Sequence, residues 1–183
     1  MTATLPIAQA SDRPSRSSSR IEDQVVELFD QWRDPLLRYV LSFGLPVHDS
    51  EEVVQEVFLA LFRHLQAGRP DFNLRAWLFR VAHNLALKHR QSMRNDSEPL
   101  LEDAADQTRD TAPTPEQLAV AKQTGRRMRA AVEKLTEHDR RCLHLRAEGL
   151  RYREIASVLG ISLGSVANSL ARSLGKLRRV EQG

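Results

Sequence analysis

The 183-residue sequence contains only one cysteine, Cys142, so it can form no internal disulfide bond. A lone cysteine beside Leu143 and Leu145 is typical of a small, buried hydrophobic side chain. The six histidines include no HExxH motif, and the chain lacks the pair of cysteines that would complete a Cys/His zinc site. We therefore expect no metal site.

Long apolar runs are missing as well. No segment approaches the roughly 18 apolar residues that cross a bilayer, and the N-terminus lacks the apolar core of a signal peptide. These absences predict a cytoplasmic protein without membrane insertion. The sequence also has no recognisable nucleophile–base pair and no Gly-rich phosphate loop, so we expect neither catalytic residues nor a cofactor.

Charge is unevenly distributed, although the net charge is only +3. Lys and Arg outnumber Asp and Glu by 14 to 7 in residues 116–183, whereas residues 95–115 contain one basic and six acidic residues. Residues 21–94 are nearly balanced, with nine basic and ten acidic residues. A compact basic segment is typical of a protein that binds a polyanion such as nucleic acid, although a solvated basic surface gives the same count.

Periodicity and composition divide the chain into four parts. Residues 1–20 are rich in Ser, Ala, Thr and Arg without periodicity, which predicts a disordered tail. Residues 21–94 and 116–183 carry helical patterns, and the acidic, proline-containing residues 95–115 predict a flexible linker. No segment has the pattern of a strand, so we expect an all-α protein of two small helical domains.

Capping residues predict where the helices begin and end. The expected starts are Asp34-Pro35, Asp49 and Asn73 in the first domain, and Thr114-Pro115, Thr136, Tyr152 and Ser162 in the second. The expected ends lie near Gly44, Leu65, Arg94, Leu135, Gly149, Leu159 and Arg179.

The strongest local signal is Arg151–Leu170, with the sequence RYREIASVLGISLGSVANSL. A short amphipathic helix is followed by Gly-Ile-Ser and a second helix, and Gly160 supplies the left-handed turn that other residues resist. Val166 and Leu170 would anchor the second helix. This pattern predicts a helix-turn-helix, whose second helix enters the major groove of DNA.

Helical spacing gives that second helix two sides. The apolar side comprises Leu163, Val166, Leu170, Leu174 and Leu177, and the polar side comprises Ser165, Asn168, Arg172, Lys176 and Arg179. Asparagine can bond adenine, and the basic side chains can bind guanine or phosphate, so the polar side is a candidate DNA-reading surface.

Three segments together resemble bacterial RNA polymerase sigma factors of the sigma-70 family, in particular the extracytoplasmic-function (ECF) group. The first is DSEEVVQEVFLALFRHL (Asp49–Leu65), the second is NLRAWLFRVAHNLALKHRQSMR (Asn73–Arg94), and the third is the helix-turn-helix. These factors consist of two helical domains, called region two and region four, joined by a flexible linker. The resemblance implies a non-enzymatic protein that binds core RNA polymerase and directs promoter recognition and transcription initiation.

In the family, the first segment binds the clamp helices of the largest polymerase subunit. Here the stripe Val54, Val57, Phe58, Leu61 and Leu65 predicts the buried side of the helix. The resemblance then implies polymerase contacts on the other positions, namely Asp49, Glu52, Gln55, Glu56, Leu59 and Arg63.

The second segment corresponds to the family's reader of the minus-ten promoter element, and the loop before it to the one that captures a flipped base. Helical spacing places Trp77 on the same side as Leu74 and Leu78, so we interpret it as a core residue and not as a stacking platform. Arg75, Arg80, His83 and Arg90 are expected to point outward. The implied DNA contacts are Phe72 and Asn73 in the loop, with Arg75, Arg80, His83, Asn84, Lys88 and Arg90 on the helix.

The third segment corresponds to the family's reader of the minus-thirty-five element. The implied contacts are Ser162, Ser165, Asn168, Ser169, Arg172, Lys176 and Arg179. The family often has Lys and Arg where this chain has Ala167 and Ser169, so we expect region four to bind DNA weakly by itself. The resemblance also implies that region four lies near the flap of the second large polymerase subunit. Many members of the family are silenced by an anti-sigma partner, and the sequence leaves open whether this chain has one.

Two other classes of function are alternatives to a sigma factor. A conventional transcriptional regulator would use the same helix-turn-helix as a dimer on a palindromic site, without polymerase. Such a regulator has no need of the first two segments, so the presence of these segments argues against this function. An enzyme is disfavoured because the chain lacks a recognisable catalytic constellation.

Overall fold

The structure, a computed structural model, describes residues 13–96 and 125–181. Every regular element in these residues is a helix, as the sequence predicts. The N-terminal domain comprises α1 (Arg13–Leu41), α2 (Val47–Gln66) and α3 (Leu74–Asp96). The C-terminal domain comprises the helical residues 125–133, α5 (Glu137–Ala147), α6 (Tyr152–Leu159) and α7 (Leu163–Glu181). Most of the predicted linker and the predicted helix start at Thr114-Pro115 lie outside the described residues.

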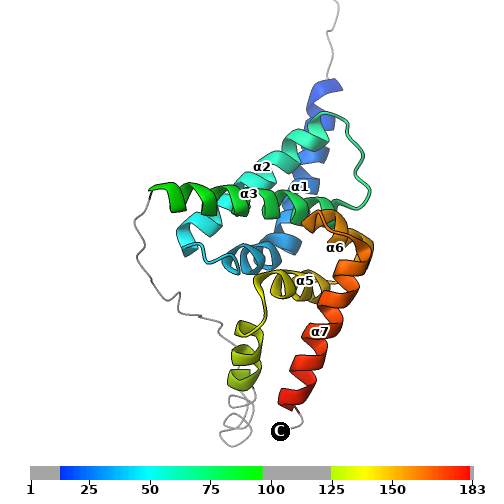
Figure 1. Ribbon diagram of the computed structural model, residues 1–183. Coiled ribbons are helices and arrows are strands. Elements are labelled where there is room, and N and C mark those ends of the chain that lie inside the picture. The colour runs from blue at the N-terminus through cyan, green and yellow to red at the C-terminus, as the bar shows by residue number, and fades with distance from the viewer. Residues whose placement is uncertain (1–12, 97–124, 182–183) are drawn as a thin grey trace, which may run out of the picture.

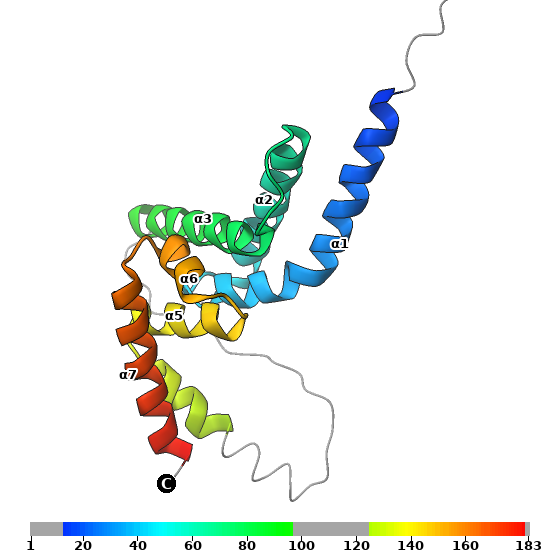
Figure 2. The ribbon, with the colours of Figure 1, turned by 90° about the vertical axis from the view of Figure 1, so that its right-hand side faces the viewer.

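The first helix is longer than the sequence predicts. Residues 13–20, expected in a disordered tail, are helical, and Asp34-Pro35 does not begin a helix because Pro35 lies inside α1. A proline ring clashes with the carbonyl four residues earlier and removes one helical hydrogen bond, which bends a helix. Figure 2 shows α1 changing direction along its length. Both sides of Pro35 remain helical because Ile21, Val25 and Phe29 before it pack against the core and Leu36 and Tyr39 after it are fully buried.

The starts of α2 and α3 are set by different residues. Pro46 directly precedes α2 and its carbonyl accepts a 2.9 Å hydrogen bond from the amide of Ser50, so the helix begins two residues before Asp49. Asp49 lies in the first turn, where the helix dipole favours negative charge. Asn73 precedes α3, as predicted, with a φ of +58°, a left-handed conformation that asparagine tolerates better than most residues.

A continuous hydrophobic core runs through both domains. The predicted stripe of α2 is buried, and Cys142 is a buried free thiol in the C-terminal domain, as expected. Trp77 is half-buried against this core, with its ring centroid 4.6 Å from that of His64. The buried side of α3 is wider than predicted and includes Phe79, Ala82 and Ala86, because α3 packs against α1, α2 and α6.

The two domains contact each other mainly through α3 and α6, which lie side by side (Figure 1). Aromatic rings line the same boundary. The ring of Tyr39 on α1 lies 5.4 Å from that of His144 on α5, and the guanidinium of Arg141 lies 4.4 Å from the centre of the Phe43 ring. The helix that carries the predicted minus-ten residues therefore faces the C-terminal domain.

The last two helices form a sharply bent pair. Within the described residues, no single helix is both long and apolar enough to span a bilayer. Taken together, α6 and α7 are long and apolar enough to span a bilayer, but the chain bends by 106° between them. An angle of this size is typical of a helix-turn-helix.

Candidate functional site

The outer side of α2 carries the residues expected to contact polymerase. Glu52, Gln55, Glu56 and Arg63 are exposed, and Asp49 is half-buried. Leu59 stands among them with 56% of its surface exposed, whereas the leucine two positions later, Leu61, is fully buried. The helix thus presents an acidic, polar surface with one exposed aliphatic side chain at its centre.

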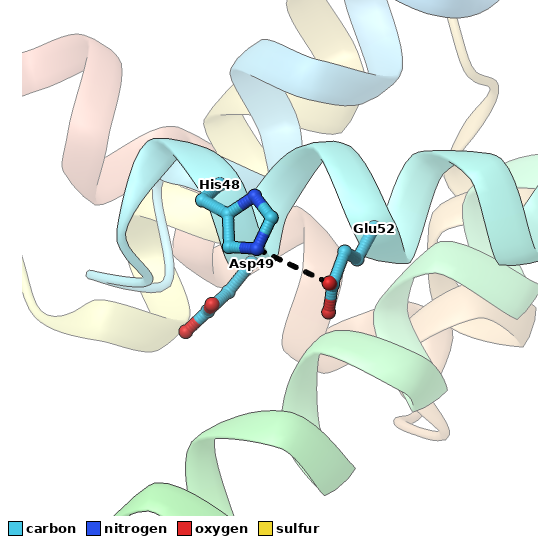
Figure 3. Close-up of side chains that lie close together, drawn as sticks. All are labelled: His48, Asp49 and Glu52. Carbon is cyan, nitrogen blue, oxygen red and sulfur yellow. Dashed lines mark ion pairs between the residues drawn. The ribbon is translucent and has the colours of Figure 1, made fainter.

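Three side chains at the start of this surface lie close together (Figure 3). His48 and Glu52, one helical turn apart, form an ion pair of 3.3 Å when the histidine is protonated, and Asp49 lies beside them. One ligand atom from each of the three falls within 4.8 Å of the others. Because His48 and Glu52 are exposed side chains of a single helical turn, we interpret the cluster as part of the acidic surface of α2 and not as a metal centre.

The polar residues of α3 separate into two groups. Asn84 and Lys88 are exposed, and so is Arg80. Arg75 and Arg90 are half-buried because their guanidinium groups reach carboxylates of the C-terminal domain, Glu154 and Glu137 respectively.

His83 was expected to point outward. It is instead buried, with 6% of its surface exposed. Its Nδ1 and the hydroxyl of Tyr39 share a hydrogen bond of 2.9 Å. Burial, with a smaller contribution from the charge of Arg141, lowers the pKa of His83 to about 4, so the ring is neutral near pH 7. A buried, neutral imidazole cannot follow a phosphate backbone. The expectation failed because α1 covers this side of α3.

The loop before α3 presents an exposed aromatic ring. Phe72 has 78% of its surface exposed, which is the largest value among the exposed large hydrophobic residues that the structure describes. Asn73, beside it, is exposed and holds the left-handed backbone conformation that turns the chain into α3. An exposed ring at a fixed turn is a suitable platform for stacking on a nucleic-acid base.

The helix-turn-helix has the turn that the sequence predicts. Gly160 ends α6 with a φ of +66°, and the amide of Ile161 donates a 3.1 Å hydrogen bond to the carbonyl of Ala156. The hydroxyl of Ser162 accepts a 3.1 Å hydrogen bond from the amide of Ser165, which caps the start of α7. Ser162 thereby acts as the predicted cap, and α7 leaves the turn in a fixed direction.

The two sides of α7 agree with the prediction only in part. Val166 and Leu170 are buried, but Leu163 and Leu174 keep 48% and 44% of their surfaces exposed. Only the middle of the apolar side is therefore covered within the domain. The expected DNA-facing residues that are exposed are Ser162, Ser165, Asn168, Arg172, Lys176 and Arg179.

Ser169, which the sequence analysis placed among the DNA contacts, is fully buried. Its hydroxyl donates a hydrogen bond to the carboxylate of Asp139, a residue of α5 with 1% of its surface exposed. Asp139 also accepts a 2.8 Å hydrogen bond from Arg172. Burial alone would raise the pKa of Asp139, but the hydrogen bonds from Arg172, Ser169 and Thr136 together hold it below its usual value.

Asp139 was not anticipated from the sequence as part of this site. Its position in the first turn of α5, after the capping residue Thr136, is sufficient to explain an aspartate there. The amide of Asp139 does donate a 3.2 Å hydrogen bond to the Thr136 hydroxyl, as a cap requires. Its carboxylate, however, turns to α7 and fixes the orientation of the recognition helix.

Comparisons with known proteins identify the family to which this chain is similar. A family model described as Sigma-70 region 2 matches residues 28–95, and one described as Sigma-70, region 4 matches residues 125–177. The ECF RNA polymerase sigma factor SigE of Mycolicibacterium smegmatis is 34% identical over 154 residues, covering 83% of this chain and 59% of SigE. The RNA polymerase sigma factor CnrH of Cupriavidus metallidurans is 33% identical, covering 74% of this chain and 75% of CnrH. A solved structure of CnrH in complex with the cytosolic domain of CnrY superposes with a TM-score of 0.57 at 26% identity, covering 92% of this chain and 94% of that one.

Proposed function

This chain belongs to the ECF group of the sigma-70 family of RNA polymerase sigma factors, and we propose that it binds core RNA polymerase and directs it to promoters. The observation that carries the proposal is that one chain combines a helix-turn-helix with the exposed surfaces of α2 and α3. The two family models match these parts in the order expected, region 2 before region 4. A factor of this kind supplies sequence specificity to an enzyme that already performs the chemistry, so the proposal requires no catalytic residue.

The outer surface of α2 is proposed to bind the clamp helices of the largest polymerase subunit. Leu59 supports this role because an exposed leucine surrounded by charged groups gives an interface an apolar centre and a polar rim. Asp49, Glu52, Gln55, Glu56 and Arg63 would supply the rim.

The proposed minus-ten surface consists of the loop before α3 and the polar side of that helix. Phe72, with its exposed ring, and Asn73 would receive an unstacked base, and Arg75, Arg80, Asn84, Lys88 and Arg90 would follow the strand. His83 is left out because it is buried. It supports the surface indirectly, by packing α3 against Tyr39.

The proposed minus-thirty-five surface lies on α7. Asn168 and Ser165 are near the start of the helix, where base edges are read, and Lys176 and Arg179 are farther along, where phosphates are contacted. Ser169 is left out because its hydroxyl is used by Asp139. With Ala167 and Ser169 at positions where the family often has basic residues, this surface is proposed to bind DNA weakly unless polymerase carries it to the promoter.

Dividing promoter recognition between two domains makes the second binding event intramolecular, so each domain can be weak while the pair is specific. The acidic residues 95–115 are proposed to link the domains across the polymerase, with region four near the flap of the second large subunit. The solved complex of CnrH with the cytosolic domain of CnrY supports the further proposal that a partner protein binds this chain, and the family resemblance favours an anti-sigma protein in that role. All of these roles place the protein in the cytoplasm, where RNA polymerase acts.

Binding to core RNA polymerase tests the proposal. The full chain should form a stable complex with core enzyme in size-exclusion chromatography, and Leu59→Asp should weaken that complex while leaving the helical circular dichroism unchanged. Val26→Asp, at a similarly exposed position on α1, is the matched control and should bind core normally. If the unaltered chain forms no complex with core and instead protects a palindromic site as a dimer, it acts as a conventional regulator.

A further inference from the structure

A histidine of α2 holds the loop that carries Phe72. His64 lies in the last turn of α2, and its Nε2 is 2.9 Å from the carbonyl oxygen of Pro70 in the loop between α2 and α3. Because a carbonyl oxygen only accepts hydrogen bonds, Nε2 carries the proton and is the donor. The carbonyl of His64 in turn accepts a 3.3 Å hydrogen bond from the amide of Arg69. His64 therefore binds the loop at two consecutive residues.

The other end of the loop is anchored against the same imidazole. The ring centroids of His64 and Trp77 lie 4.6 Å apart, with the ring planes tilted by 44°. Trp77 lies near the start of α3, and its amide donates a 3.2 Å hydrogen bond to the carbonyl of Asn73. Residues 67–73 are all exposed, so the loop buries no side chain of its own that could hold it. Its position depends on the contacts at its two ends.

Packing alone does not explain a histidine at position 64. Nδ1 of His64 is buried and has no hydrogen-bond partner among the residues that the structure describes. A buried polar atom without a partner lowers the stability of a protein, and an apolar ring of similar size would avoid that loss. What the imidazole adds to such a ring is the donor at Nε2, and its acceptor is the loop.

His64 also fixes the loop relative to the proposed polymerase-binding surface. It directly follows Arg63 on α2 and lies five positions after Leu59. A loop held by the last turn of this helix keeps a constant distance from the surface on the same helix. An aromatic ring that is already in place also binds its ligand more tightly, because no loop freedom is lost on binding.

We propose that His64 is a positioning residue of the minus-ten surface, which uses its hydrogen bond to Pro70 to hold Phe72 and Asn73 ready for an unstacked base. In this role His64 acts through the loop and touches no DNA itself. The inference deepens the proposed function, on which it rests for the identity of the ligand. The order of the loop is a property of the free chain.

Three variants separate the donor from the ring. His64→Phe keeps an aromatic ring against Trp77 but loses the donor. His64→Gln keeps an N–H donor at a similar distance from the backbone but loses the ring, and His64→Leu loses both. His138→Phe makes the first of these changes at an exposed histidine of α5 and is the matched control.

The first measurement uses the full chain without polymerase or DNA. Nitrogen-15 relaxation gives order parameters for the backbone amides of Asp71 and Phe72, which are about 0.85 in rigid backbone and below about 0.6 in flexible segments. We expect values near the rigid limit in the unaltered chain, in His64→Gln and in His138→Phe. In His64→Phe and His64→Leu the values should fall below about 0.6.

The second measurement follows promoter opening by core polymerase with each variant, through the fluorescence of 2-aminopurine in the minus-ten element. A neutral hydrogen bond favours the ordered loop by about twofold to tenfold, so His64→Phe should open promoters more slowly by that factor than His138→Phe. Both variants should bind core polymerase equally well. The urea midpoint of His64→Phe should be no lower than that of the unaltered chain, because the unpaired Nδ1 is removed.

The inference is wrong if the order of the loop depends on the ring, so that the loop is ordered in His64→Phe and flexible in His64→Gln. It is equally wrong if the loop of the unaltered chain is flexible, or if opening by His64→Phe is as fast as by the control. Should His64→Phe not fold, His64→Gln and His64→Leu, which differ in the donor, give the same comparison. A chain that does not bind core contradicts the proposed function, whereas the relaxation measurement still tests the role of His64 in ordering the loop.

Discussion

The carboxylate of Asp139 on α5 accepts a 2.8 Å hydrogen bond from Arg172 on α7, although the two residues are 33 positions apart. The carboxylate is buried, whereas the arginine side chain keeps 57% of its surface exposed. Arg172 is therefore held at one end by the domain while its remaining surface faces solvent. This arrangement orients the recognition helix and leaves part of the guanidinium available to a phosphate.

Replacing Asp139 with alanine should destabilise the C-terminal domain. The fully buried hydroxyl of Ser169 would lose its acceptor, and an unsatisfied buried donor costs about 1–3 kcal/mol. Urea unfolding followed by circular dichroism should show a loss of this size. Arg179→Ala, at an exposed position of the same helix, should change the free energy of unfolding by less than about 0.5 kcal/mol. Equal stabilities of the two variants would mean that the Asp139 network does not fix α7.

Replacing Asn168 with alanine should impair promoter reading without affecting folding. The side chain is exposed near the start of α7, and one lost base contact costs about 1–3 kcal/mol, or roughly fivefold to 160-fold in promoter affinity. Run-off transcription with saturating protein should fall, while binding to core polymerase stays unchanged. A parallel loss of core binding would show that the DNA-reading side of α7 has been assigned incorrectly.

Replacing Phe72 with alanine should affect promoter opening alone. The ring is largely exposed, so its loss should change stability by less than about 0.5 kcal/mol. Stacking of a base on an aromatic ring contributes about 1–3 kcal/mol, and its removal should reduce the fraction of open complexes. Fluorescence of 2-aminopurine placed in the minus-ten element measures that fraction. Val47→Ala, at another exposed hydrophobic position, should open promoters normally.

Stability should decrease on mild acidification because of His83. Its pKa is 6.5 in the unfolded reference and about 4 in the folded protein, so between these values only the unfolded state takes up the proton. The stabilisation is complete above pH 6.5 and is lost as the pH falls towards 4, by about 2 kcal/mol at pH 5. Urea unfolding at pH 7 and pH 5 measures this loss. His83→Leu should reduce the difference between the two pH values, and His48→Gln, which alters an exposed histidine, should retain it.

The parts of the fold that depend on local signals could be predicted. Thr136, Gly160 and Ser162 set helix ends through their own backbone and side-chain groups, and the structure has α5, α6 and α7 beginning at the expected positions. The first half of α1 could not be predicted in this way. Its Ser-rich start has low helical propensity, and the helix is stabilised by packing against α2, as in the 4.8 Å ring contact of Phe29 with Phe58.

The two site residues that were placed incorrectly lie at the edges of helix faces. Periodicity separates an apolar side from a polar side, but it does not show whether a distant helix covers the boundary between them. Tyr39, 44 positions away, covers His83, and Asp139, 30 positions away, receives Ser169. The contact between the domains was equally inaccessible, because charge patterning along the chain does not indicate which carboxylate meets which arginine.

Transcription reconstituted from purified components tests the central claim most directly. Core RNA polymerase is incubated with genomic DNA of the source organism, with and without this protein, and the 5′ ends of the RNA are sequenced. The account predicts start sites that appear only when the protein is present and that share two upstream elements at a constant spacing, one for α3 and one for α7. It is contradicted if the protein adds no start sites while remaining folded and binding DNA by itself at palindromic sequences.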